Sequence, residues 1–169
     1  MSPFWTALIA SGAILTIILA TDLGTRRLTT WRILRSVLAV VVVVAFFVRS
    51  LPLDGNDPLL QLAGIGLGLI CGLIGGTLLP AHREESGHIF TVGGVGYALL
   101  WTLLSAARVV FAYGSEHWFG PDIVRFSINY QLSGQDVYAN TFVFMAVAMV
   151  LARTGVLMAK RRRLVREAG

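Results

Sequence analysis

Cysteine and lysine are almost missing from this chain, and charged residues are few. Cys71 is the only cysteine and Lys160 the only lysine, so 13 of the 14 basic residues are arginine. A single cysteine excludes an intrachain disulfide, a Cys-x-x-Cys redox pair and a cysteine-based metal cluster. Charged residues make up 14% of the chain, whereas soluble domains usually carry about 25%. The composition therefore indicates that water is not the main solvent.

Apolar residues are abundant and make up 56% of the chain. A helix needs roughly 20 apolar residues to cross about 30 Å of hydrocarbon. Five runs meet this requirement, at approximately 4–22, 31–50, 59–80, 89–113 and 138–159. Helices are expected because a helix satisfies its own backbone hydrogen bonds in lipid. We therefore predict an all-α polytopic membrane protein in which residues 1–169 form one bundle of five transmembrane helices.

Basic residues predict the orientation of this bundle, because cytoplasmic loops are enriched in Lys and Arg. They follow the first run at Arg26, Arg27, Arg32 and Arg35, and the last run at Lys160, Arg161, Arg162, Arg163 and Arg166. The N-terminus is then outside and the C-terminus cytoplasmic. Segment 114–137 is outside as well, and its aromatic residues favour a partly helical piece at the outer interface. The excess of arginine over lysine suggests a bacterial source, so we expect the bacterial plasma (inner) membrane.

The third run carries the strongest packing signal. Gly64, Gly68, Gly72 and Gly76 recur at every fourth position and lie along one narrow stripe of the helix. A stripe without side chains, a glycine zipper, lets another helix approach closely. The sequence leaves two partners open: the fourth helix with its own glycines, or a second copy of the chain in a homodimer.

Arg108 is the main charge inside a predicted span. Such a charge costs a few kcal/mol unless it snorkels, pairs or faces a polar cavity. Two interpretations stay open: a snorkelled or paired arginine, with Asp136, Glu116 or Asp122 as partner, or an arginine that contacts an anionic ligand or lipid headgroup. Arg153 lies near the cytoplasmic end, where orientation and headgroup contact explain it.

Asp22 ends the first run, and we interpret it as a helix terminator within reach of Arg26. The loop 82–88 concentrates His82, Glu84, Glu85 and His88, but this spacing matches no metal signature and favours a solvated turn. We find no catalytic motif and no intramembrane pair of carboxylates. We therefore predict no metal, no cofactor and no catalytic site.

A glycine-bearing third helix, the loop after it and a downstream arginine together resemble a known family. The matching positions are Gly68, Gly72, Arg83, Glu85, Gly87 and Arg108. They resemble the CcdC-like group of small bacterial multi-pass membrane proteins, which is associated by name with cytochrome c biogenesis. The resemblance implies the helical architecture and makes Arg83, Glu85 and Arg108 candidate ligand-binding residues. It carries over no haem-ligating or thiol-redox residue.

Three classes of function remain open from the sequence. The leading hypothesis is a non-catalytic accessory or assembly factor that acts by helix packing, through the glycine stripe, on another membrane protein or a second copy. The alternatives are a binding or transport component that uses Arg108, and a small intramembrane enzyme or metal site at loop 82–88. Membrane lipids are the expected partners in each case, and nucleic acid is not, because the basic residues flank apolar runs.

Overall fold

The computed structural model describes residues 3–47, 53–84 and 87–167. Six helices and three strands lie in these ranges. In chain order they are α1 (Pro3–Asp22), β1 (Gly24–Arg27), α2 (Thr30–Phe47), α3 (Asp57–Thr77), β2 (Ala81–Arg83), β3 (Ile89–Gly93), α4 (Val95–His117), α5 (Gly120–Asn129) and α6 (Gln135–Arg166). Most of the described chain is helical, as predicted, but the prediction of an all-α protein is wrong in detail because the structure also contains a three-stranded sheet.

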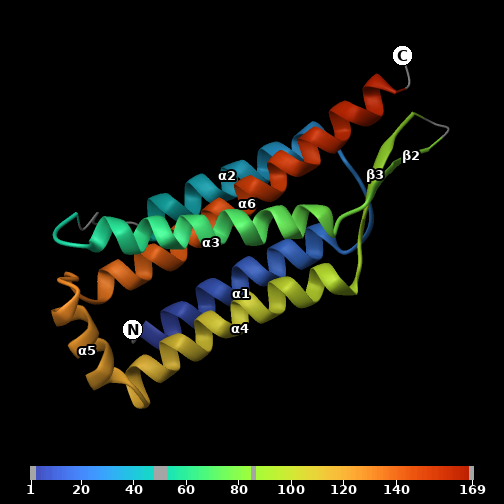
Figure 1. The fold of residues 1–169 in the computed structure, drawn as a ribbon. Helices are drawn as coiled ribbons and strands as arrows, with labels where there is room; N and C mark the ends of the chain where they lie inside the picture. Colours follow the sequence, from blue (N-terminus) through green and yellow to red (C-terminus); the bar gives the residue numbers. More distant parts are fainter. Residues whose placement is uncertain (1–2, 48–52, 85–86, 168–169) are drawn as a thin grey trace.

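The five long helices run alongside one another in two groups (Figure 1). One group pairs α1 with α4, and the other packs α3 and α2 against α6. The three strands lie at one end of the bundle, which we call the sheet end, and α5 lies at the opposite end, the α5 end. A buried cluster that includes Ile18, Leu79, Tyr97, Trp101 and Met149 joins the two groups.

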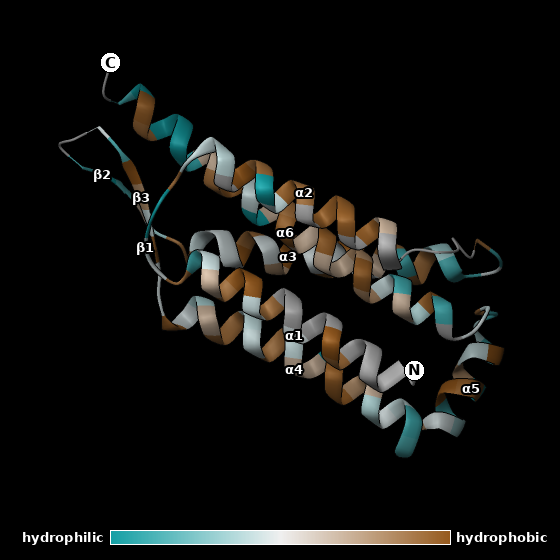
Figure 2. Cartoon of the chain, turned by 180° about the vertical axis from the view of Figure 1, so that it is seen from behind, coloured by the Kyte–Doolittle hydropathy of each residue, from teal (hydrophilic) through white to brown (hydrophobic). Residues whose placement is uncertain are grey.

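Three helices are long and apolar enough to cross a membrane: Asp57–Thr77, Val95–His117 and Asp136–Arg166. Their apolar surfaces extend along the bundle, and polar residues gather at the C-terminal end of α6 (Figure 2). α6 has 32 residues and is therefore about 48 Å long at 1.5 Å per residue. It exceeds the hydrocarbon thickness, so its last basic turns extend beyond the apolar part of the bundle.

Residues 89–93 form a strand, and the prediction that the fourth helix begins at residue 89 is wrong. β3 is the central strand of an antiparallel sheet with the order β1-β3-β2, in which Arg27 pairs with Phe90 and Ala81 with Thr91. The stretch Ile89-Phe90-Thr91-Val92 is rich in β-branched and aromatic residues, which favour a pleated, half-buried surface. Within the predicted turn 82–88, His82 and Arg83 belong to β2, and the described residues Glu84, Gly87 and His88 are exposed, as expected of a solvated turn.

The connection at the α5 end is ordered around the start of α3. Asp57 is fully buried, and its carboxylate accepts hydrogen bonds from the Ser133 backbone N–H at 2.9 Å and from the Ser133 hydroxyl at 2.5 Å. Asn56 Nδ2 also donates to the Tyr130 carbonyl at 3.0 Å. These bonds hold the segment between α5 and α6 against the α3 N-terminus.

The glycine stripe of α3 lies against α6. A Cβ added at Gly68 would lie 2.2 Å from the Met145 carbonyl oxygen, and one at Gly72 would lie 2.3 Å from the Met149 carbonyl oxygen. Gly64 and Gly76 meet α6 in the same way. The close partner of the stripe is therefore α6 of the same chain, rather than α4.

Candidate functional site

A buried polar cluster connects four helices near the sheet end. Asp22 of α1 forms an ion pair with Arg153 of α6. Tyr97 Oη of α4 donates to Asp22 Oδ2 at 2.5 Å and accepts from Arg153 Nη1 at 2.7 Å. Arg153 Nη2 also donates to the Ser36 hydroxyl of α2 at 3.3 Å. The cluster therefore ties α1, α2 and α4 to α6.

One interpretation made from the sequence is wrong and another is incomplete. Arg153 is 4% exposed, so it does not contact lipid headgroups. Asp22 does end α1, as predicted, but it is 1% exposed and pairs with Arg153 rather than with Arg26. A buried charge is tolerated when it is paired and hydrogen-bonded. Asp22 and Arg153 are paired with each other and bonded to Tyr97, and only the Nε atom of Arg153 has no hydrogen-bond partner among the described residues of this cluster.

A second polar row runs along α4 toward the α5 end. Trp101, Ser105 and Arg108 are all buried, at spacings of four and three residues that place them on one helix face. Trp101 Nε1, Ser105 Oγ and the Nε and Nη2 atoms of Arg108 have no hydrogen-bond partner among the described residues. Arg108 itself is 6% exposed. Buried polar atoms normally have a hydrogen-bond partner. The atoms of this row lack such partners among the described residues.

Arg108 lies deep in the bundle. Its Cα is about 20 Å along α4 from Val95 and about 14 Å from His117, at 1.5 Å per residue. The thiol of Cys71 on α3 lies within electrostatic range of its guanidinium. Arg108 is therefore buried among the helices, on the side of α4 that faces α3.

The acidic residues considered as partners of Arg108 do not form a hydrogen bond with its Nε or Nη2 atom. Asp136, Glu116 and Asp122 are all exposed, and none of them bonds the Nε or Nη2 atom of Arg108. A thiol such as Cys71 is a weak hydrogen-bonding group. Within the described chain, two of the guanidinium nitrogens thus lack a counterpart.

The fold does not place Arg83 close to Arg108. It is an exposed residue of β2, at the sheet end, whereas Arg108 lies about 20 Å along α4 from that end. Glu85 lies outside the described residues. No group of three His, Cys, Asp or Glu side chains that could hold a metal ion is found in the described ranges.

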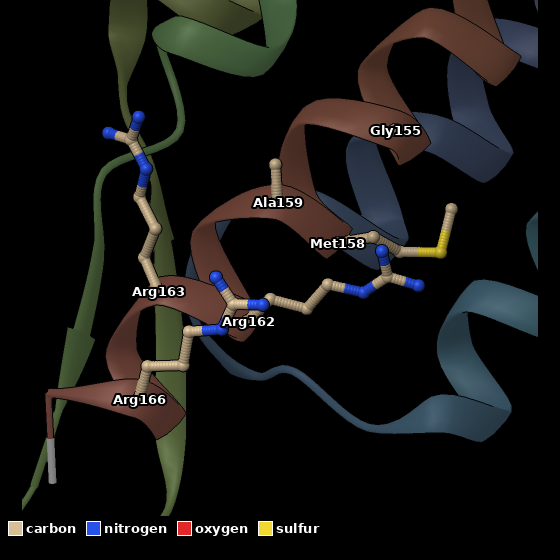
Figure 3. Close-up of a pocket in the computed structure, with 6 residues that line it drawn as sticks. All are labelled: Gly155, Met158, Ala159, Arg162, Arg163 and Arg166. Carbon is tan, nitrogen blue, oxygen red and sulfur yellow. The ribbon is translucent and has the colours of Figure 1, made fainter.

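Two open hollows line the sheet end. The first, of about 350 Å³, lies on α6 and is lined by Gly155, Met158, Ala159, Arg162, Arg163 and Arg166. Figure 3 shows Arg162 and Arg163 pointing to different sides of α6. The second, of about 470 Å³, lies between the end of α1, β1 and the start of α2, and its lining includes Arg26, Arg27, Trp31 and Arg35. We call this second cavity the arginine hollow.

Lys160 joins the basic tail to the α3 C-terminus. Its Nζ donates to the carbonyls of Gly76 at 2.8 Å and Leu79 at 2.7 Å. Carbonyls at a helix C-terminus lack intrahelical partners and attract cations. The only lysine of the chain therefore caps α3.

Comparison with protein-family models, curated proteins and solved structures finds no match. The resemblance to the CcdC-like group stays a prediction.

Sequence reasoning selected Arg108 as a candidate ligand-binding residue but did not group Tyr97, Trp101 and Ser105 with it. All four are buried on α4, and their spacing of four, four and three residues places polar atoms along one face of an apolar helix. That periodicity was the available signal. The partnership of Asp22 with Arg153 had no signal in the sequence, because the two residues lie in the first and last helices.

Proposed function

We propose that this chain is a multi-pass protein of the bacterial plasma membrane that binds an anionic group at Arg108. In this proposal all five long helices cross the membrane, with α1 entering from outside and α6 ending in the cytoplasm. The ends of α1, α3 and α6 lie at the sheet end, as do the starts of α2 and α4. The same end carries the arginines Arg26, Arg27, Arg161 and Arg163. An excess of Lys and Arg is typical of cytoplasmic loops, so we assign the sheet end to the cytoplasm.

The observation that carries the binding proposal is the buried, incompletely bonded guanidinium of Arg108. A charge in the interior of a transmembrane bundle needs a partner, a cavity or a path to the interface. Arg108 is buried among the helices, and no carboxylate of the described chain bonds its Nε or Nη2 atom. A guanidinium presents a planar fork of donors that matches carboxylate or phosphate oxygens. An anionic group is thus the ligand class that completes the site.

Ser105 and Trp101 add neutral donors beside this charge. Both have an unsatisfied polar atom on the same face of α4 as Arg108. An anion held by Arg108 would have a hydroxyl and an indole N–H within the same row for its remaining oxygens. The row therefore favours a ligand with several acceptor oxygens over a monatomic ion.

Native mass spectrometry of the full chain, isolated gently from its own membrane, tests this function. We expect wild-type protein to carry an adduct whose mass identifies the anionic group. Arg108→Leu should weaken its retention by at least about 30-fold, because truncating one side of a buried charge pair costs roughly 2–5 kcal/mol. Arg108→Lys should retain part of it, because the charge stays while the bidentate fork is lost.

Arg125→Leu provides the matched control. Arg125 is an exposed arginine on α5, so its loss changes the net charge equally without touching the α4 row. The adduct should survive this change. Wild-type protein without any anionic adduct, or equal retention by wild type and Arg108→Leu, would contradict the proposal.

An accessory or assembly role is a second proposal. It is supported by the sequence, which offers helix-packing residues but no catalytic motif. In this role the chain would contact its partner through another surface than the glycine stripe expected from the sequence, because α6 already packs against that stripe. Co-purification of a protein partner that survives loss of the anionic adduct would favour this role over ligand binding.

A further inference from the structure

The arginine hollow concentrates positive charge where three elements meet. Arg26 and Arg27 come from β1, and Arg35 lies one turn after Trp31 on α2. No acidic side chain lines the hollow among the described residues. Its volume of about 470 Å³ can hold a headgroup-sized ligand. Charge complementarity therefore selects an anion.

Two of the three arginines are held in place. Arg26 donates from Nε to the Leu23 carbonyl and from Nη2 to the Ala20 carbonyl, both at 3.3 Å, at the end of α1. Arg27 Nη2 contacts His88 Nδ1 at 2.7 Å. None of these partners is a carboxylate, so they orient the guanidinium groups without cancelling their charge.

The surface next to the hollow is apolar. Trp31 is 68% exposed, and Leu34 and Leu38 follow it on the same face of α2 at 54% and 57% exposure. An exposed tryptophan between arginines and an aliphatic stripe is typical of a membrane interface. The face thus changes from cationic to apolar within two helical turns, in the way that a phospholipid changes from headgroup to acyl chain.

We propose that the arginine hollow binds the phosphate of an acidic phospholipid, with an acyl chain lying along Leu34 and Leu38. This inference rests on the membrane assignment made above, but not on ligand binding at Arg108. Basic pockets beside transmembrane helices on the cytoplasmic side are suited to anionic headgroups. The adjoining apolar face favours a lipid over free phosphate, which would gain nothing from Leu34 and Leu38.

The hollow on α6 is the natural comparison. It is also basic, but all its lining residues come from one helix and none is aromatic. Arg162 and Arg166 are separated by one turn and lie on the same side of α6 (Figure 3). Removing these two charges is therefore a matched control for removing two charges from the arginine hollow.

The test measures binding of phosphatidylglycerol and phosphatidylcholine to the purified full chain by native mass spectrometry in detergent. We expect wild type to prefer phosphatidylglycerol. Arg27→Gln/Arg35→Gln should weaken phosphatidylglycerol binding about 30-fold, given the usual contribution of each basic residue near anionic lipid. Arg162→Gln/Arg166→Gln should change it by less than about threefold. Arg26 is left intact because it also bonds the end of α1.

Two further measurements distinguish the remaining outcomes. Arg27→Lys/Arg35→Lys keeps both charges and should restore most of the binding, which shows that the Gln pair failed through charge rather than misfolding. Inorganic phosphate at millimolar concentration should not displace the lipid; displacement would assign the hollow to the free anion and overturn the lipid proposal. Equal losses in the two Gln pairs, or no preference for phosphatidylglycerol, would overturn it as well. None of these outcomes alters the adduct lost in Arg108→Leu.

Discussion

Asp22 and Arg153 form an ion pair that joins the first and last helices of the bundle, with Tyr97 bonded to both. Asp22 is 1% exposed and Arg153 is 4% exposed. Taking two charges out of water costs several kcal/mol per ion, and their attraction offsets this only when further hydrogen bonds support the pair, as Tyr97 and Ser36 do here. The pair therefore acts as a specific lock between the α1–α4 group and the α6 group.

Asp22→Asn should destabilise the protein by about 3–5 kcal/mol, because it leaves the Arg153 charge buried without its counterion. Unfolding by denaturing detergent in bicelles measures this change. The double variant Asp22→Leu/Arg153→Met should recover most of the loss, since replacing both charges by apolar groups removes the desolvation cost. A single variant as stable as wild type would show that the pair does not lock the helices.

Gly68→Ala should destabilise the bundle by roughly 1–3 kcal/mol through overpacking. The added Cβ would lie 2.2 Å from the Met145 carbonyl oxygen, so α3 and α6 would have to separate. Gly66→Ala is the control, because nothing lies within 4 Å of a Cβ at that position and alanine favours the helix. Equal stability of both variants would contradict the close packing of the stripe on α6.

The proposed orientation predicts opposite accessibility of two exposed residues, Asn129 at the end of α5 and Glu167 just after α6. In a Cys71→Ser background, Asn129→Cys should react with an impermeant thiol reagent added to whole spheroplasts. Glu167→Cys should react only after the membrane is permeabilised. Labelling of both positions from the same side would rule out the crossing of α6 between them, and the unsubstituted background measures non-specific reaction.

Local physics made much of the fold predictable. A helix of about 20 apolar residues is a requirement of length and backbone hydrogen bonding within one segment, so α3 and the long helix that includes residues 138–159 follow from their own residues. The helix predicted for residues 89–93 is wrong because the conformation of this stretch is not set by its own residues. This apolar stretch continues into α4 without a break in hydropathy, and its strand conformation depends on pairing with Gly24–Arg27, far away in the chain.

The candidate site was predictable only in part for the same reason. Arg108 could be identified because a charge inside an apolar run is unusual. Whether it snorkels, pairs or stays unsatisfied depends on which helices surround it, and the spacing of residues within α4 cannot decide that. Glycine spacing likewise predicted close packing, but either α4, α6 or a second copy would have met that requirement.

By itself, the sequence determined the apolar character of the chain, the approximate position of its long helices and the gathering of arginine at particular helix ends. These properties depend on composition and on residues near one another. Only the tertiary structure decided that α6 fills the glycine stripe, that Asp22 pairs with Arg153, and that Arg108 is buried among the helices. Each of those relationships joins distant segments, and its free energy exists only once both segments are packed together.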